Sequence, residues 1–345
     1  MMDRICICGG GALGHVIASW ISGHHHVRVN ILTNHPEKWE HHIVVDTPDG
    51  EVLQGEIDLI SNDANEVIPS SHVVLLCLPG FLIQEELERI KPYLDSDTYV
   101  GSVFSSTGFF FEAQKILDET QPLWGFQRVP FISRVQEYGK SAHLLGFKSS
   151  YSIAIEHVAE EEKVKFASII QHWFERPVNV LNNFYEASLT NSNPLLHTSR
   201  LYTMFGGKNE GRIYPRMLLF YEEWTEEAAD LYIKMDEEFF KLLKVLPVSE
   251  NYLPTVLDYY DSYDAKSLAA KLSSISGFKG ITSPMIETSE GWIADFNSRY
   301  FTEDFPFGLK YIWQLAHKHG VFCPNIDKVY QWGISKIYYN IKCHI

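Results

Sequence analysis

Three glycines near the start of the chain have the spacing of a phosphate-binding loop. The segment RICICGGGALGHVIASW places Gly9, Gly11 and Gly14 between a strand-like run and a helix-like run. In this G-x-G-x-x-G pattern, the first glycine permits a tight turn, the second lets a pyrophosphate approach the backbone, and the third lets helix and strand pack closely. N–H groups at the positive end of the helix would hold the diphosphate. The loop is therefore predicted to bind a dinucleotide through Gly9, Gly10, Gly11, Ala12, Leu13 and Gly14.

The residues at the end of the second predicted strand help to decide between NAD and NADP. The segment VRVNILTNHPEKW ends in Thr33 and Asn34, and Lys38 follows. An acid at this place would bind the ribose 2′-OH of NAD, and its absence removes repulsion against a 2′-phosphate. Hydroxyl, amide and lysine groups are able to bind such a phosphate. We expect NAD or NADP, with a slight preference for NADP. A later strand, in SHVVLLCLPG, places Leu78 and Pro79 at the same cofactor, because ligands bind at the carboxyl ends of strands in such sheets.

Short β-branched runs alternate with helical patterns in the first half of the chain, as in a parallel α/β sheet. The predicted strands span 4–8, 27–33, 73–78, 99–104, 143–147 and 152–155, the predicted helices span 12–21, 82–91 and 110–117, and a hairpin is expected within 43–60. After about residue 180 the pattern is helical, over 184–205, 221–246, 267–274, 307–319 and 326–339. We predict an α/β Rossmann-type doubly wound domain over residues 1–180, and an all-α domain for substrate binding and catalysis over residues 181–345.

Polar residues in two segments of the helical half have spacings that suit chemistry. In TNSNPLLHTSRLYTMF, Asn193 and His197 are four residues apart, which places them on one face of a helix that Pro194 is able to start. In NSRYFTEDFPFGL, Thr302 resembles a helix N-cap, which would put Asp304 in the first helical turn. Each residue taken alone is more often structural than catalytic.

The glycine loop, NPLLH and RYFTEDFPFGL together resemble the opine dehydrogenase family, of the octopine and nopaline dehydrogenase type. The resemblance implies a dinucleotide-binding domain followed by a helical domain. It also implies that the enzyme condenses a 2-oxo acid with the amino group of an amino acid and reduces the product with NAD(P)H. The segment FQRVPFISRVQEYGK follows the family pattern only loosely, so the resemblance does not indicate which amino acid is used.

The resemblance also assigns roles to single residues. His197 matches the catalytic histidine, Asp304 the acid that pairs with it, and Arg299 the arginine that binds a substrate carboxylate. Asn193 matches a polar substrate-binding position near the histidine. These roles are chemically coherent, because a histidine moves protons near neutral pH, a carboxylate fixes its tautomer, and a guanidinium grips a carboxylate through two hydrogen bonds. Two alternatives remain: a reductase of ketones or 2-oxo acids resembling ketopantoate or glycerol-phosphate enzymes, and a non-catalytic dinucleotide-binding protein.

Composition limits the remaining possibilities. The 345 residues carry 29 basic and 44 acidic side chains, and the net charge of −15 argues against a nucleic-acid partner. The five cysteines form no metal-ligand or disulfide pattern, and no apolar run is long enough to span a membrane. We expect a cytoplasmic monomer or homodimer without a signal peptide or a metal, whose partners are a 2-oxo acid and an amino acid.

Overall fold

The computed structural model describes residues 2–343, and the chain divides into two compact units, Met1–Thr190 and Asn191–Ile345. We call them the N-terminal unit and the helical unit. The division falls after Thr190 rather than after residue 180, because two further elements pack onto the sheet of the N-terminal unit. Strand β12 (Val178–Val180) pairs with β11 (Tyr151–Glu156), and helix α6 (Phe184–Ser188) packs on the same strand.

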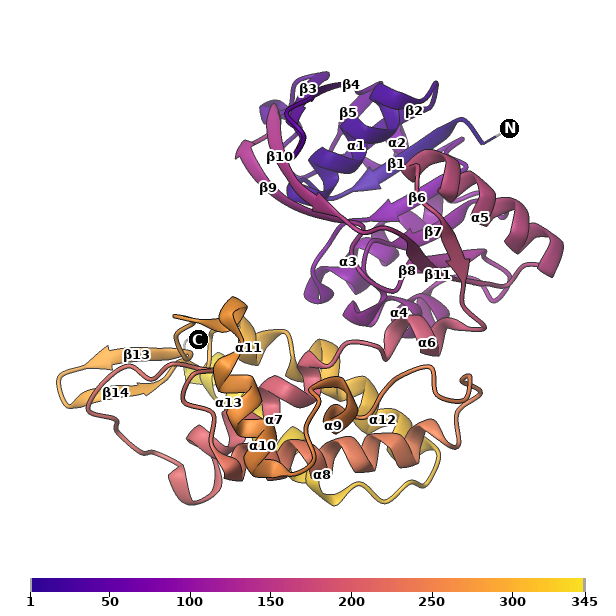
Figure 1. Cartoon of the computed structure of the whole chain (residues 1–345). Helices are drawn as coiled ribbons and strands as arrows, with labels where there is room; N and C mark the ends of the chain where they lie inside the picture. Colours follow the sequence, from indigo (N-terminus) through magenta and orange to yellow (C-terminus); the bar gives the residue numbers. More distant parts are fainter. Residues whose placement is uncertain (1, 344–345) are drawn as a thin grey trace. The chain divides into compact units, whose positions relative to one another are not determined.

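An eight-stranded sheet forms the centre of the N-terminal unit, in the order β12-β11-β8-β7-β6-β1-β2-β5 (Figure 1). Besides β11 and β12, the sheet contains β1 (Arg4–Cys8), β2 (Arg28–Leu32), β5 (Leu59–Ser61), β6 (Val73–Leu76), β7 (Tyr99–Ser102) and β8 (Leu123–Phe126). The run from β5 to β8 is parallel throughout. The chain leaves β1 toward β2 on one side and returns to β6 on the other. This is the doubly wound arrangement predicted from the sequence, and its ligand crevice lies at the switch between β1 and β6.

The N-terminal unit also contains helices, and the inner strands of its central sheet are buried on both faces. The helices of this unit are α1 (Ala12–His24), α2 (Ala64–Val67), α3 (Gly80–Ile90), α4 (Phe109–Ile116), α5 (Glu160–Phe174) and α6. Strand β1 shows the two faces clearly, since Ile5 and Ile7 join one buried cluster while Cys6 and Cys8 join the other. All four side chains are fully buried, so this strand is anchored on both faces immediately before the glycine loop.

A second sheet of four strands, in the order β4-β3-β10-β9, packs against α1. Strands β3 (His42–Asp46) and β4 (Val52–Glu56) form the hairpin predicted within 43–60, and β9 (Phe131–Glu137) and β10 (Ser141–Phe147) form another. The predicted strand at 143–147 therefore belongs to this second sheet and not to the central one. Its parallel pairing with β3 joins segments that are distant in the sequence, so local pattern could not reveal it.

The helical unit is built on α7 (Asn193–Phe205) and α8 (Glu226–Leu243), with α10 (Ala265–Ser274) and α13 (Pro324–Cys343) packed against them. Smaller helices are α9 (Val256–Tyr259), α11 (Arg299–Thr302) and α12 (Lys310–Lys318). The predicted helix 184–205 is interrupted between α6 and α7. A short hairpin of β13 (Met285–Thr288) and β14 (Gly291–Ala294) was not predicted. Within residues 2–343, no helix has the length and apolar character needed to cross a membrane.

Candidate active site

The glycine loop after β1 has the shape that the sequence predicted. Gly9 has a φ of +118°, and a Cβ there would also lie 2.8 Å from the carbonyl oxygen of Cys77. A Cβ at Gly14 would fall on the carbonyl oxygen of Gly9, so α1 packs too closely for any side chain. Gly11 differs, because a Cβ there would meet no atom within 4 Å. The fold itself therefore requires Gly9 and Gly14, whereas the space above Gly11 is open.

The start of α1 adds an electrostatic feature to this open space. Gly11 is the N-cap and has no side chain with which to satisfy the first N–H groups of the helix, which begins at Ala12. Ala12 and Leu13 are half-buried, and the following residues are buried. Unsatisfied N–H groups at a helix N-terminus favour an anion. The geometry of the loop thus fits the pyrophosphate of a dinucleotide.

Two contacts that sequence reasoning missed join the loop region to the tip of the β9–β10 hairpin, one through His15 of α1 and one through Tyr138 of the hairpin. The His15 ring is fully buried; its Nδ1–H donates to the carbonyl oxygen of Gly11 (2.9 Å), and its Nε2 accepts from the N–H of Gly139 (2.7 Å). Burial lowers the pKa of His15, which keeps Nε2 free to accept. The hydroxyl of Tyr138 lies where a Cβ of Gly10 would fall, and it is 3.1 Å from Thr33 Oγ1. No local sequence pattern links residues so far apart.

The end of β2 carries a further unpredicted group. Thr33 is buried, whereas Asn34 and Lys38 are exposed, and Lys38 closes a short 3₁₀ turn. Arg89 of α3 reaches this place: its Nη1 donates to Asn34 Oδ1 (3.3 Å), and its Nη2 donates to the carbonyl oxygen of Asn62. Glu86 holds the same guanidinium at 3.2 Å. A guanidinium therefore lies at the strand end where NAD-binding folds often carry an acid.

Leu78 and Pro79 follow β6, the strand next to β1 in the sheet. The Leu78 side chain lies 2.8 Å from the position that a Cβ of Gly9 would occupy, and Pro79 is the N-cap of α3. Both residues are half-buried. The structure thus brings the β6 end against the glycine loop, at the switch point of the sheet.

In the helical unit, His197 and Asp304 are hydrogen bonded. The distance from His197 Nδ1 to Asp304 Oδ2 is 2.8 Å, and the two side chains are only 11% and 17% exposed. His197 lies on α7, which carries Pro194 in its first turn, as the sequence predicted. A π-helical turn, Phe305–Leu309, packs on that first turn so closely that a Cβ at Gly308 would lie 2.7 Å from the Pro194 ring. This packing brings the residue before the turn, Asp304, to the histidine.

The other ring nitrogen of His197 has a partner that the sequence did not suggest. His197 Nε2 is 2.8 Å from the hydroxyl oxygen of Tyr221, and the Tyr300 ring lies edge-on at 4.8 Å between centroids. Burial, reinforced by Tyr300, Tyr260 and Asp304, raises the pKa of Tyr221. The phenol therefore remains protonated, and it donates to Nε2 whenever that nitrogen carries no proton. This leaves the proton of His197 on Nδ1, where it is donated to Asp304.

The segment before Asp304 corrects one prediction. Thr302 is not an N-cap, because Ser298 precedes α11 and Thr302 is the last residue of that helix. The Arg299 side chain is 82% exposed, and its Nε and Nη2 atoms donate to the two carboxylate oxygens of Glu303 at 2.8 and 2.9 Å. Asn193 is exposed at the start of α7, one turn before His197. The roles of Arg299 and Asn193 in substrate binding remain predictions.

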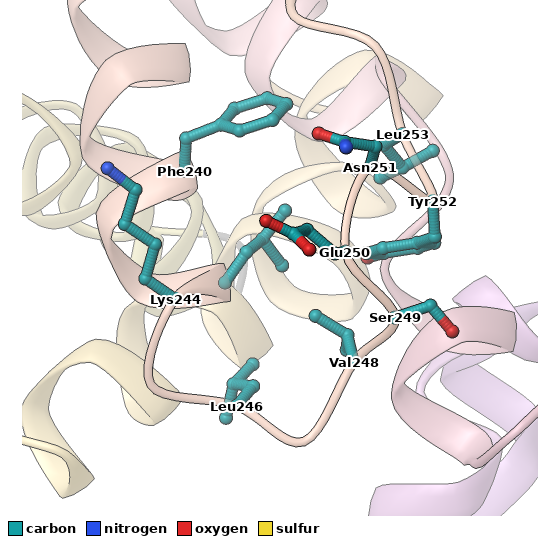
Figure 2. A pocket seen from close by; sticks show the side chains of 10 residues that line it. Phe240, Lys244, Leu246, Val248, Ser249, Glu250, Asn251, Tyr252 and Leu253 are labelled. Carbon is teal, nitrogen blue, oxygen red and sulfur yellow. The ribbon is translucent and has the colours of Figure 1, made fainter.

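A separate hollow of about 360 Å³ opens beside the C-terminal end of α8 and the loop that follows it (Figure 2). Apolar side chains such as Phe240 and Leu246 line it together with Glu250 and Asn251. It contains neither His197 nor Asp304. The hydrogen-bonded pair of His197 and Asp304 therefore lies outside this hollow.

Comparison with known proteins finds similarity to one family along most of the chain. Residues 180–337 match the family described as NAD/NADP octopine/nopaline dehydrogenase, alpha-helical domain. The chain is 24% identical to octopine dehydrogenase of Pecten maximus, over 98% of this chain and 91% of that one. It is 26% identical to tauropine dehydrogenase of Arabella iricolor, over 96% and 91% of the two chains. The chain is thus similar to opine dehydrogenases over nearly its whole length.

Solved structures of opine dehydrogenases have a fold similar to that of this chain. A structure of octopine dehydrogenase with NADH and L-arginine has a TM-score of 0.83 at 23% identity, covering 97% of this chain and 89% of the other. A structure of yersinopine dehydrogenase with NADP⁺ has a TM-score of 0.70 at 13% identity, covering 99% and 91%. The predicted fold class, an α/β domain followed by a helical domain, is confirmed.

Proposed function

We propose that the protein joins a small 2-oxo acid, such as pyruvate, to the amino group of an amino acid and reduces the product to a secondary amine dicarboxylate. The observation that carries this proposal is the enclosed His197–Asp304 pair in a chain similar to opine dehydrogenases. When bound, the reduced nicotinamide cofactor supplies the hydride for this reaction. Relatives support the substrate class, since solved octopine dehydrogenase structures are described with L-arginine and with pyruvate.

The helical unit supplies the proton chemistry. The amine attacks the carbonyl carbon to give a carbinolamine, whose hydroxyl group must gain a proton before water leaves. The His197 imidazolium, formed when the imidazole takes a proton from the ammonium group of the incoming amino acid, is the source of that proton, and the Asp304 carboxylate stabilises the cation while it exists. Arg299 would bind a substrate carboxylate once it exchanges Glu303 for the ligand, and the loss of this exposed ion pair costs about 1 kcal/mol or less. Asn193, one turn before the histidine, would add a polar contact to the substrate.

The direct test is oxidation of NADPH and NADH at neutral pH with pyruvate and other 2-oxo acids, each with and without a pool of amino acids. Turnover that requires the amine and falls at least about 10²-fold in His197→Ala is the expected result. The control is His317→Ala, which removes an exposed histidine that is paired with Asp327 at the same 2.8 Å distance. Turnover with the oxo acid alone would instead establish a carbonyl reductase.

We further propose that the cofactor is NADPH in preference to NADH. The support is the guanidinium of Arg89 at the end of β2, beside Asn34, in the absence of an acid at that strand end. Arg89→Ala should raise the KM for NADPH by about 10-fold or more and leave the KM for NADH within twofold. Arg28→Ala, at the opposite end of the same strand, should change neither constant. An equal loss with both cofactors in Arg89→Ala would contradict the preference.

A further inference from the structure

The His197 imidazole is enclosed on all the sides through which it could exchange a proton. Nδ1 is hydrogen bonded to Asp304 and Nε2 to Tyr221, both at 2.8 Å. The rings of Tyr300 and Phe220 lie edge-on against it, with centroids at 4.8 and 5.6 Å. A proton that leaves Nε2 therefore either passes through the hydroxyl of Tyr221 or requires that hydroxyl to move away.

The surroundings of Tyr221 oppose such a movement. Its ring is stacked on Phe278, with centroids 4.0 Å apart and planes 19° apart, and it is nearly parallel to the ring of Trp224 at 6.0 Å. The residue is 5% exposed. A swing of the phenol away from His197 would break this stacking and leave Nε2 without its hydrogen bond.

The backbone that carries Tyr221 is also held in place. Arg200, one turn after His197 on α7, donates from Nε to the carbonyl oxygen of Phe220 (3.2 Å) and from Nη2 to that of Glu223 (2.7 Å). The N–H of Phe220 donates to the carbonyl oxygen of Ile281 (2.8 Å). The helix that carries the histidine thus fixes the loop that carries the tyrosine, on both sides of Tyr221.

We propose that Tyr221 is the proton relay between His197 and the substrate. The inference rests on the imine-forming reaction proposed above. In the dehydration step, the imidazolium gives its Nε2 proton to Tyr221 Oη while the Tyr221 O–H gives its proton to the hydroxyl oxygen of the carbinolamine. The carbon–oxygen bond breaks, water leaves, and the nitrogen lone pair forms the carbon–nitrogen double bond. Tyr221 is a neutral phenol before and after the step, and His197 ends neutral.

The relay makes Tyr221→Phe informative, because this variant keeps the stacked ring and removes one oxygen atom. We expect kcat to fall by about 10²-fold, with the KM values for the oxo acid, the amine and NADPH within threefold of wild type. Tyr311→Phe is the matched control, since it makes the same change at another buried tyrosine of the helical unit and should leave kcat unchanged. The thermal midpoints of both variants should stay close to that of the wild type.

A proton inventory in mixtures of H₂O and D₂O separates a relay from a structural role. Two protons move together in the relay, so the plot of kcat against deuterium fraction should be curved for the wild type and linear for Tyr221→Phe. If substrate displaces the tyrosine and contacts Nε2 directly, Tyr221→Phe will equal or exceed wild-type kcat, and both plots will be linear; that result overturns the relay while amine-dependent turnover stands. A wild-type enzyme without amine-dependent turnover overturns the reaction itself, and the relay with it.

Discussion

Replacing Asp304 by asparagine removes one negative charge from the Asp304–His197–Tyr221 chain and keeps the size of the side chain. The carboxylate is 2.8 Å from His197 Nδ1, and because both side chains are largely buried, solvent screens their interaction little. In the variant, an asparagine that turns its amide N–H toward Nδ1 would move the imidazole proton to Nε2, which would then donate to Tyr221. An asparagine that turns its oxygen toward Nδ1 keeps the tautomer but still loses the charge.

The size of the effect follows from that hydrogen bond. A hydrogen bond to a charged group contributes about 1.5–3 kcal/mol, and the imidazolium formed during turnover depends on it more than the neutral ring does. Since about 1.4 kcal/mol corresponds to a tenfold change in rate, Asp304→Asn should lower kcat by about 10-fold to 100-fold, and by more if the tautomer reverses. Steady-state NADPH oxidation measures this, and cofactor fluorescence should show an NADPH Kd within twofold of wild type.

A second histidine–aspartate pair in the helical unit provides the control. His317 Nε2 and Asp327 Oδ1 are also 2.8 Å apart, but these side chains are 54% and 32% exposed. Asp327→Asn should leave kcat unchanged, because exposed ion pairs contribute little and this pair has no assigned chemistry. The reasoning is refuted if Asp304→Asn retains kcat within twofold, or if both variants lose activity equally.

Three further predictions concern cofactor binding and stability. Gly11→Ala should fold like the wild type, because its Cβ meets no protein atom within 4 Å, and it should weaken NADPH binding by about 10-fold or more. Gly14→Ala should instead lower the thermal midpoint. Normal NADPH affinity in Gly11→Ala would argue against a pyrophosphate at the loop. Burial raises the pKa of Asp236 from 3.8 to about 6, so the folded state retains a proton that the unfolded chain has released, and stability falls as the pH rises through this window. Between about pH 4 and pH 7 the wild type should lose up to about 3 kcal/mol of unfolding free energy that Asp236→Asn keeps, as measured by urea denaturation. Parallel stability curves for the two proteins would contradict this. Buried Glu238 accepts hydrogen bonds from the N–H groups of Asn325 and Ile326 at the start of α13, so Glu238→Gln should cost about 2 kcal/mol in the same assay, and a cost below about 0.5 kcal/mol would show that the charge is not needed there.

The parts of the molecule that the sequence predicts well are those encoded locally. Strand β1, the glycine loop and α1 are adjacent in the chain, so the types of their residues predict the local backbone conformation. Gly9, for example, adopts a φ of +118°, which other residues rarely do. Alternation along β1 likewise assigns its side chains to two faces. The change to helical patterns after the sheet reveals the second domain, although the helix α6 that precedes Thr190 still belongs to the first.

Contacts between distant residues were not predictable in the same way. His197 and Asp304 are 107 residues apart, and only a family resemblance suggested pairing them. The helix predicted over 221–246 begins only at Glu226, so Tyr221 lies in the turn before α8, and no pattern connects it to His197 Nε2. Thr302 has the residue type of an N-cap but ends α11, because the chain begins that helix earlier, after Ser298, and then passes into the π-helical turn. Tertiary packing overrides local preference at that place.

The residues that would handle protons are held together within the helical unit alone. His197 comes from α7, Asp304 from the residue before the π-helical turn, and Tyr221 from the loop that Arg200 of α7 secures. Each ring nitrogen of His197 therefore has a partner before any substrate binds, and the neutral imidazole has one defined tautomer. Hydrogen bonds that stabilise the charge formed during turnover are therefore already in position. A protein stabilises such a charge better than water does, because its hydrogen-bonding groups do not have to reorient during the reaction. The same enclosure makes the hydroxyl of Tyr221, rather than the imidazole itself, the group from which a substrate would receive its proton.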